Sequence, residues 1–298
     1  MRYLSYLLLI LIFYFLFKNL NLTIFLINLK KIKFEYLFIA LLISCTLPIL
    51  ATLRWKFIVK KFEKNINFND LFKSVMIAFY ANVFMPAKSG DFSKAITMPK
   101  SISKYKLISA VISERIIDLI SLFLLSLSGS FFLYKEIFNI LIIIFIIFII
   151  LLIILRSFFK KSRDFKSAII DKIFKIIFYI YETLFLKKKY TLFVLIFSFS
   201  IWLLVGIQIY LFFIALNNQI NIFHVILLYP VTIFATMIPL SPGGVGIRES
   251  AFIFVFSKYA NYSVNFTVGL MYYLFNVLFI ALIGSFFINQ YIWKKYKK

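Results

Sequence analysis

Three charged side chains lie inside one apolar stretch of this 298-residue chain: Glu114, Arg115 and Asp118, within Val111–Ile120. A charge at the centre of a bilayer costs about 2.5–3.5 kcal/mol on insertion scales, so these side chains cannot all face lipid. Arg115 and Asp118 have the i,i+3 spacing of a helical ion pair, whereas Glu114 and Asp118, at i,i+4, repel. Glu114 therefore needs a cation from another segment. In the alternative interpretation the group lies at the cytoplasmic interface, roughly 10 Å into the helix.

A second group is a glycine-rich turn, containing Gly243, Gly244 and Gly246, that Arg248 and Glu249 follow directly. Glycine allows positive φ and close backbone approach. A helix that starts after such a turn presents free N–H groups and the positive end of its dipole. This arrangement suits a phosphate, to which Arg248 can add bidentate contacts. The spacing is not that of a nucleotide P-loop, and the alternative is a plain loop with a solvated Arg-Glu pair.

The first half of the chain contains a comparable break at Pro86–Asp91, which includes Lys88. Paired breaks in two halves favour the binding interpretation. Arg54-Trp55 ends an apolar stretch, where the default role is an interfacial anchor and the alternative is a lipid-phosphate contact. We predict that lipid headgroup or phosphate binding involves Arg54, Lys88, Gly243, Gly244, Gly246 and Arg248, and that an intramembrane charge network comprises Asp91, Glu114, Arg115, Asp118 and Glu249.

The composition requires that these residues be positioned by membrane helices. Hydrophobic residues make up 63% of the chain and charged residues 15%, against about 45–50% and 25% in soluble domains. This excludes a secreted domain, a cytosolic enzyme and a disordered chain. The lone Cys45 and the lone His224 exclude an intramolecular disulfide, a Cys-based zinc site and a His cluster, and we predict no metal or cofactor. The net charge of +23 is attributed to juxtamembrane loops, not to nucleic-acid binding.

The predicted fold is an all-α polytopic membrane protein with about six transmembrane helices and two re-entrant broken hairpins. The helices are predicted at Leu4–Phe17, Tyr36–Leu53, Leu107–Leu133, Ile137–Leu155, Thr191–Leu216 and Val264–Ile288, and the hairpins begin with Phe68–Met85 and Ile220–Leu240. The first span resembles a secretory signal, but no small-residue cleavage site follows it, so we expect an uncleaved anchor.

The basic residues predict the orientation of the spans. With both termini cytoplasmic, 26 Lys and Arg lie inside and 7 outside, which is the expected bias. The chain is then predicted to be a single membrane domain over residues 1–298 of a multi-pass cell-membrane protein. Its halves, at about 36–134 and 191–290, are predicted to form an inverted repeat. A basic segment, 156–190, joins the halves. Its isoleucine stripe predicts an amphipathic helix in the plane of the inner leaflet.

Four stretches resemble the flippase-like family of lysylphosphatidylglycerol synthase transmembrane regions. They are Leu53–Trp55, Asn82–Asp91, Ser113–Asp118 and Pro239–Ser250, in the family's order and over nearly the whole chain. The family's larger members join this region to a cytosolic aminoacyl-transferase domain that makes lysylphosphatidylglycerol. This chain ends at Lys298, so the resemblance implies the lipid-handling membrane part without the synthase activity.

The leading hypothesis is a membrane protein that binds a phosphate-bearing lipid headgroup and assists its translocation between leaflets. Glu114, Asp118 and Glu249 would balance charge or contact a cationic headgroup. The expected partners are membrane lipids, either an anionic phospholipid or a lipid-linked headgroup, with an enzyme of lipid or glycan synthesis as a further candidate. The alternatives are a membrane accessory or enzyme of lipid or glycan-lipid biosynthesis, and a gradient-driven small-solute transporter. We predict no enzymatic activity, because the sequence shows no catalytic constellation. The oligomeric state stays open.

Overall fold

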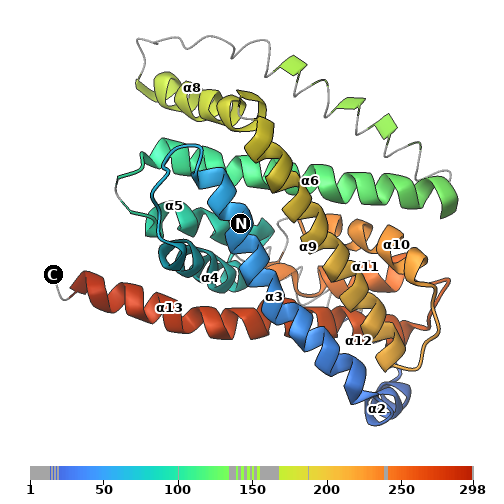
Figure 1. Ribbon diagram of the computed structural model, residues 1–298. Coiled ribbons are helices and arrows are strands. Elements are labelled where there is room, and N and C mark those ends of the chain that lie inside the picture. Colours follow the sequence, from blue (N-terminus) through green and yellow to red (C-terminus); the bar gives the residue numbers. More distant parts are fainter. Residues whose placement is uncertain are drawn as a thin grey trace. The chain divides into compact units, whose positions relative to one another are not determined.

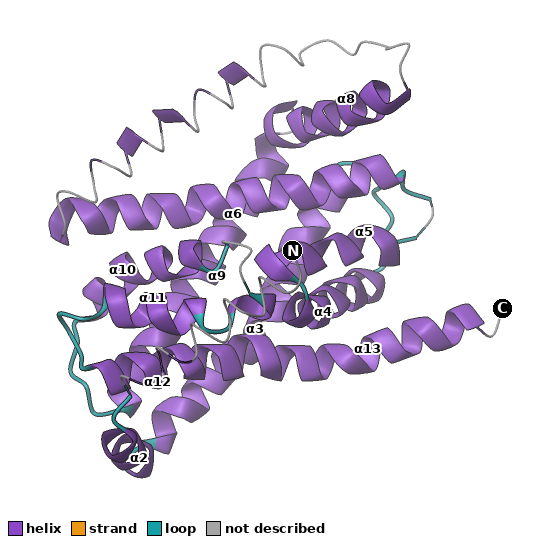
Figure 2. Cartoon of the chain, turned by 180° about the vertical axis from the view of Figure 1, so that it is seen from behind, coloured by secondary structure: helices purple, strands orange, loops and turns teal. Residues whose placement is uncertain are grey.

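The computed structural model describes residues 20–99, 101–133, 168–186, 188–237 and 241–296, together with single positions between 14 and 18 and between 139 and 154. Throughout this described part the regular elements are helices, and no strand occurs (Figures 1 and 2). The α-helices are α2 Leu22–Lys30, α3 Phe34–Val59, α4 Phe68–Phe84, α5 Ser93–Thr97, α6 Lys104–Leu133, α8 Ala168–Tyr181, α9 Lys188–Ala215, α10 Ile222–Ala235, α11 Ile247–Val255, α12 Tyr262–Tyr273 and α13 Phe279–Tyr296. Short 3-10 segments, η1 Pro86–Phe92 and η3 Pro242–Gly244, and π-helical turns, η2 Glu182–Leu186 and η4 Leu274–Leu278, complete the list.

Three described helices are long and apolar enough to cross a membrane: Phe34–Val59, Lys189–Ala215 and Tyr262–Tyr291. They contain the spans predicted at 36–53, 191–216 and 264–288 almost completely. The third runs unbroken through α12, η4 and α13. The prediction of an all-α membrane protein is thus confirmed for the described residues.

The predicted span Leu107–Leu133 also lies within one helix, α6, which is not among the three helices long and apolar enough to cross a membrane and which contains Glu114, Arg115 and Asp118. The predicted spans at 4–17 and 137–155 fall almost entirely outside the described residues. The total of about six spans therefore stays a prediction.

Both predicted hairpins contain a helix, a break and a second helix. In the first, α4 is followed by η1, where Ala87 and Lys88 have positive φ, and then by the short α5. In the second, α10 precedes η3 and α11, and α10 packs against α11. Their insertion into the membrane from opposite sides, and with it the inverted repeat, stays a prediction.

The chain divides into two compact units, each of which is described by itself. Unit 1 comprises Met1–Leu47, Phe79–Gly90 and Leu203–Lys298, and unit 2 comprises Pro48–Ala78 and Asp91–Trp202. Each unit is built from segments distant in sequence, and α3, α4 and α9 contribute one end to each. The division therefore does not follow the predicted halves of the sequence.

The core of unit 1 is aromatic. Phe213, Phe252 and Phe256 are fully buried, with ring centroids 5.1 Å apart for Phe213–Phe256 and 5.8 Å for Phe252–Phe256. Other phenylalanines of this unit face outward: Phe254 is 78% exposed and Phe286 is 72% exposed. A soluble protein would bury such side chains, whereas a membrane protein presents them to lipid tails.

The core of unit 2 surrounds Trp55, which is fully buried together with Ile58, Leu71 and Ile117. The amphipathic helix predicted within 156–190 is present as α8, and it packs against α6. Its contact side includes the buried Phe174, whereas Ile173 of the predicted isoleucine stripe is 53% exposed. One side of α8 is therefore covered by protein, and the in-plane membrane location stays a prediction for its other side.

Gly206 offers a test of the packing between α9 and α10. A Cβ at this position would lie 2.8 Å from Cε1 of Tyr229, a side chain that is itself fully buried. We expect Gly206→Ala to lower the free energy of unfolding by about 1–3 kcal/mol, because the ring cannot move away without strain. Thermal unfolding in detergent measures the effect.

The control is Ile196→Ala on the same helix, at a residue that is 49% exposed. Equal melting temperatures for Gly206→Ala and this control would contradict the packing of α9 against α10.

Candidate functional site

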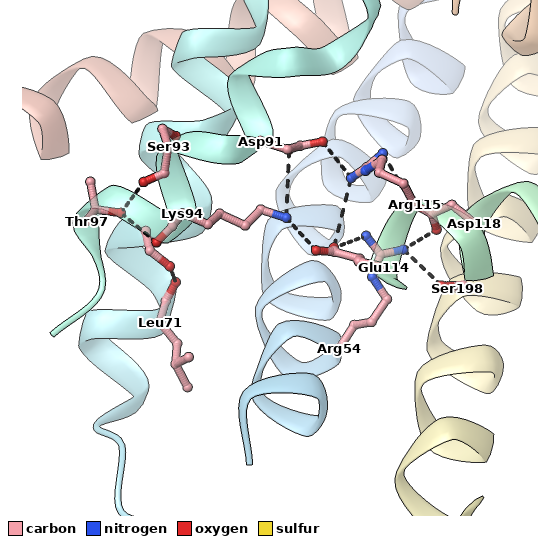
Figure 3. Close-up of polar contacts among 11 residues, drawn as sticks. Arg54, Leu71, Asp91, Ser93, Lys94, Thr97, Glu114, Arg115, Asp118 and Ser198 are labelled. Atoms are coloured by element: carbon pink, nitrogen blue, oxygen red, sulfur yellow. Dashed lines mark hydrogen bonds and ion pairs between the residues drawn. The ribbon is translucent and has the colours of Figure 1, made fainter. Parts of the chain in front are cut away.

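Six charged side chains of unit 2 form a closed ring in which positive and negative groups alternate (Figure 3). We call this set the charge ring. In order around the ring its members are Arg54 from α3, Glu114 from α6, Lys94 from α5, Asp91 from η1, and Arg115 and Asp118 from α6.

Glu114 forms ion pairs with two cations of the ring. Its Oε1 lies 2.5 Å from Nη2 of Arg54, and its Oε2 lies 2.7 Å from Nζ of Lys94. These are the cations from other segments that the sequence required for Glu114. Arg54 is 60 residues away along the chain, and Lys94 is 20 residues away.

The other side of the ring is closed by Asp91 and Asp118. Nη2 of Arg115 lies 2.8 Å from Asp91, and Nη1 of Arg115 lies 3.2 Å from Asp118, which confirms the predicted i,i+3 pair. Asp118 also forms an ion pair with Arg54. The longest link joins Lys94 and Asp91, at 3.7 Å.

The ring is almost completely removed from solvent. Five side chains are 0–7% exposed, and Arg115 is 25% exposed. Buried ions are tolerated only where partners neutralise them, and three cations here face three carboxylates. Neutral groups add further bonds: Nε1 of Trp202 donates to Asp118 at 3.2 Å, and Arg54 donates to Oγ of Ser198 at 3.0 Å.

The ring includes four of the five residues predicted for the charge network. Arg54, which was predicted at the headgroup, is instead engaged with two carboxylates inside this ring. Lys94 was not among the predicted site residues, although its i,i+3 spacing from Asp91 was a usable signal. Glu249, predicted for the same network, belongs to unit 1, where it interacts with its own helix.

The glycine-rich turn of unit 1 has the backbone that its composition predicts. Gly243, Gly244 and Gly246 have φ of 60°, 73° and 84°, a region that strains other residues. Gly246 precedes α11, and its N–H donates to Oε2 of Glu249 at 2.6 Å. Glu249 therefore caps the start of the helix that follows the turn.

Arg248 is buried beside this turn. Arg248 is 4% exposed, and its Nη2 donates to the carbonyl oxygen of Gly243 at 2.8 Å. Its guanidinium carbon lies 5.1 Å from the ring centroid of Tyr272 and 5.3 Å from that of Tyr273. Within the described residues Nε and Nη1 have no hydrogen-bond acceptor, and no carboxylate forms an ion pair with Arg248.

The turn is shaped around this side chain. A Cβ at Gly244 would lie 3.2 Å from Nη2 of Arg248, so a side chain there would crowd the guanidinium. A Cβ at Gly243 would lie 3.1 Å from the carbonyl oxygen of Val83, at the end of α4. The end of α4 and the second broken segment therefore adjoin in unit 1, which also contains the half-buried Lys88.

A polar network that the sequence analysis missed also lies in unit 1. Nε2 of Gln208, in α9, donates to the carbonyl oxygen of Ala40 at 2.8 Å and to Oγ of Ser44 at 2.7 Å. Oε1 of Gln208 accepts a hydrogen bond from Nδ2 of Asn276 at 2.8 Å. Asn276 lies in the π-helical turn η4, a distortion often found at functional sites. The signal was available, because an amide within an apolar span needs a partner.

The described residues contain no group of three or more His, Cys, Asp or Glu side chains with a geometry that could hold a metal ion. The charge ring has no unmet charge to offer a ligand, since its carboxylates and cations neutralise one another. Arg248, by contrast, is a buried cation whose surroundings supply aromatic faces and one carbonyl. Of the two sites, it is the one whose cation has no carboxylate ion pair within the described residues.

These features define an α-helical membrane protein with buried ionic groups. The chain belongs to the family described as the lysylphosphatidylglycerol synthase TM region, whose model matches residues 2–284. The predicted resemblance is thereby confirmed. A UPF0104 membrane protein of Methanocaldococcus jannaschii is 24% identical over 256 residues, covering 76% of this chain and 75% of that protein. A second UPF0104 membrane protein of this organism is 33% identical over 89 residues, or 30% of this chain and 38% of that protein.

The charge ring predicts a large difference between buried and exposed ion pairs. Glu114→Gln leaves Arg54 and Lys94 facing an uncharged group, and we expect a loss of about 3–5 kcal/mol in the free energy of unfolding. The matched control is Asp171→Asn, which removes the exposed 2.6 Å pair with Lys175 and should cost less than ~1 kcal/mol. Equilibrium unfolding in mixed SDS and mild-detergent micelles measures both.

A double variant, Glu114→Gln with Lys94→Gln, returns the ring to charge balance. We expect its loss in free energy of unfolding to be smaller than the sum of the losses of the two single variants. Additive losses would show that the two side chains do not act as parts of one ring.

Proposed function

We propose that this protein binds a phosphate-bearing lipid headgroup within the membrane and assists its movement between leaflets. The observation that carries the proposal is the state of Arg248, which is 4% exposed and has two donor nitrogens without an acceptor in the described residues. A buried cation of this kind is costly unless an anion neutralises it. Arginine is the residue best suited to phosphate oxygens.

The turn before Arg248 supports a phosphate. Gly243, Gly244 and Gly246 keep side chains away from the start of α11, and the first N–H groups of a helix favour an anion. Tyr272 and Tyr273 hold the guanidinium by cation–π contacts. Lys88, on the first broken segment of the same unit, is proposed to guide the headgroup. We reassign Arg54 to the charge ring, where it supports the fold.

Movement across the membrane is proposed from the broken helices. Non-helical backbone at membrane depth is tolerated where it is covered by protein or lines a wet cavity. Paired breaks in two halves are typical of transporters whose substrate site lies near the midplane. The family membership supports a lipid as the transported species. We place the protein in the cell membrane with both termini cytoplasmic.

The first test is the lipid content of the purified protein. Wild type should retain a phosphate-bearing lipid that mass spectrometry identifies, and Arg248→Ala should retain at least about tenfold less, since a charge-assisted contact contributes about 1.5–3 kcal/mol. Arg248→Lys, which keeps the charge but loses the planar donors, should fall between them. Lys64→Ala, at an exposed residue, is the control and should match wild type.

Reconstituted vesicles test movement directly. Wild type should transfer an acyl-labelled phospholipid between leaflets faster than Arg248→Ala does. If wild type moved no phospholipid, and inorganic phosphate alone raised its melting temperature through Arg248, the site would belong to a soluble anion and the proposal would be wrong.

The orientation is tested by labelling single cysteines in a Cys45→Ala background. With both termini cytoplasmic and each hairpin returning to its own side, the predicted topology places residues 54–106 inside and Lys258 outside. Both Asn65 and Lys258 are exposed. A membrane-impermeant maleimide should label Asn65→Cys and Lys258→Cys from opposite sides in oriented vesicles. Labelling from one side would overturn the predicted topology.

A further inference from the structure

Two adjacent residues of α11 have buried polar atoms without a hydrogen-bond partner among the described residues, donors in one residue and an acceptor in the other. Nε and Nη1 of Arg248 are donors without an acceptor, and Oε1 of Glu249 is an acceptor without a donor, within the part of the chain that the structure describes. Arg248 is 4% exposed and Glu249 is 3% exposed. Buried polar atoms are nearly always hydrogen-bonded. Unsatisfied donors and an unsatisfied acceptor on two consecutive residues are therefore candidates for contact with one ligand.

Helix capping accounts for only one of the two carboxylate oxygens of Glu249. Oε2 accepts the hydrogen bond from the N–H of Gly246 at 2.6 Å, which completes the cap. In an ordinary cap of this kind the second oxygen points to water. Here it is buried, and none of the ion pairs of the described residues includes Glu249. The second oxygen is therefore available to a group that enters the site.

Both residues pack against the same face of α12. The Cα of Glu249 would lie 3.1 Å from a Cβ at Gly269, and the guanidinium of Arg248 contacts the rings of Tyr272 and Tyr273. Residues three and four apart on a helix share a face. Arg248 and Glu249 thus contact positions on one face of α12 that lie within about one turn of each other.

The charge balance of this region selects the ligand. Arg248 and Glu249 carry one positive and one negative charge, so their sum is zero. An anionic headgroup would satisfy Arg248 and leave Glu249 facing an additional negative charge in a medium of low dielectric. A headgroup with one phosphodiester and one ammonium group satisfies both residues and keeps the region neutral.

We propose, building on the proposed lipid site, that this protein is selective for zwitterionic over anionic phospholipids, with Arg248 bound to the phosphodiester and Oε1 of Glu249 accepting from the ammonium group. Glu249 is then the residue that determines headgroup specificity, in addition to its capping role. Glu249 thereby distinguishes phospholipids by the net charge of their headgroups.

The test separates the two roles of Glu249. Glu249→Gln keeps a carbonyl oxygen that can cap Gly246, and it replaces the free acceptor by an NH₂ donor. Vesicles would contain phosphatidylethanolamine or phosphatidylglycerol labelled on the acyl chain, so that each headgroup stays native. We expect wild type to move the ethanolamine lipid about tenfold faster than the glycerol lipid, which corresponds to one charge-assisted hydrogen bond. In Glu249→Gln this ratio should fall to about one or below.

Two further measurements make the result independent of folding. The ratio of the two lipids that co-purify with each variant should change in the same direction, and melting curves should show Glu249→Gln to be folded. Glu35→Gln, at an exposed residue of α3, is the matched control and should keep the wild-type ratio.

The outcomes distinguish this inference from the proposed function. Equal movement of both lipids by wild type, or an unchanged ratio in Glu249→Gln, would overturn the selectivity and leave lipid movement intact. Movement of neither lipid would overturn both, and binding of glycerophosphoethanolamine in that case would assign the site to a soluble zwitterion.

Discussion

The low dielectric of the membrane is the constraint on which this structure depends, because a buried charge is costly unless an opposite charge neutralises it. The charge ring is the response in unit 2: Glu114, Arg115 and Asp118 on α6 are neutralised by Arg54 of α3 and by Asp91 and Lys94 of the η1–α5 segment. In lipid, helices gain little from burying apolar surface against one another. The ring joins α3, η1, α5 and α6 of this unit, whose apolar core includes Leu71 and Ile117.

The charge ring and the site of Arg248 differ in whether the buried cations have carboxylate partners among the described residues. In the charge ring each carboxylate has at least two cationic partners, and only Arg115 reaches appreciable exposure. Arg248 is as deeply buried as the ring, yet its partners are two aromatic faces and the carbonyl oxygen of Gly243. Arg248 is therefore the buried cation for which we propose an anionic ligand group. Charged residues in apolar segments thus occur in two environments here, and only the tertiary contacts distinguish them.

Much of the architecture followed from the sequence because it depends on local properties. Apolar length predicted the helices that became α3, α9 and α12–α13, and the spacing of Arg115 and Asp118 predicted their ion pair. Glycines with positive φ were expected in the turn at 243–246 and were found there. The demand of Glu114 for a distant cation was also predictable, since it rests on repulsion within one helix. The identity of that cation was not, because Arg54 was equally compatible with an interfacial anchor.

By itself, the sequence determined that this is a helical membrane protein of the lysylphosphatidylglycerol synthase TM family, with ionic groups that lipid cannot solvate. Hydropathy, helical spacing and glycine conformations are properties of neighbouring residues, so they are readable without a fold. The tertiary structure decided which charges meet: it assigned Arg54 and Lys94 to Glu114, and it placed Arg248 against Tyr272, with no carboxylate ion pair among the described residues. Those choices depend on helices distant in the chain, and pairing energies act only once packing has brought the side chains within a few ångströms.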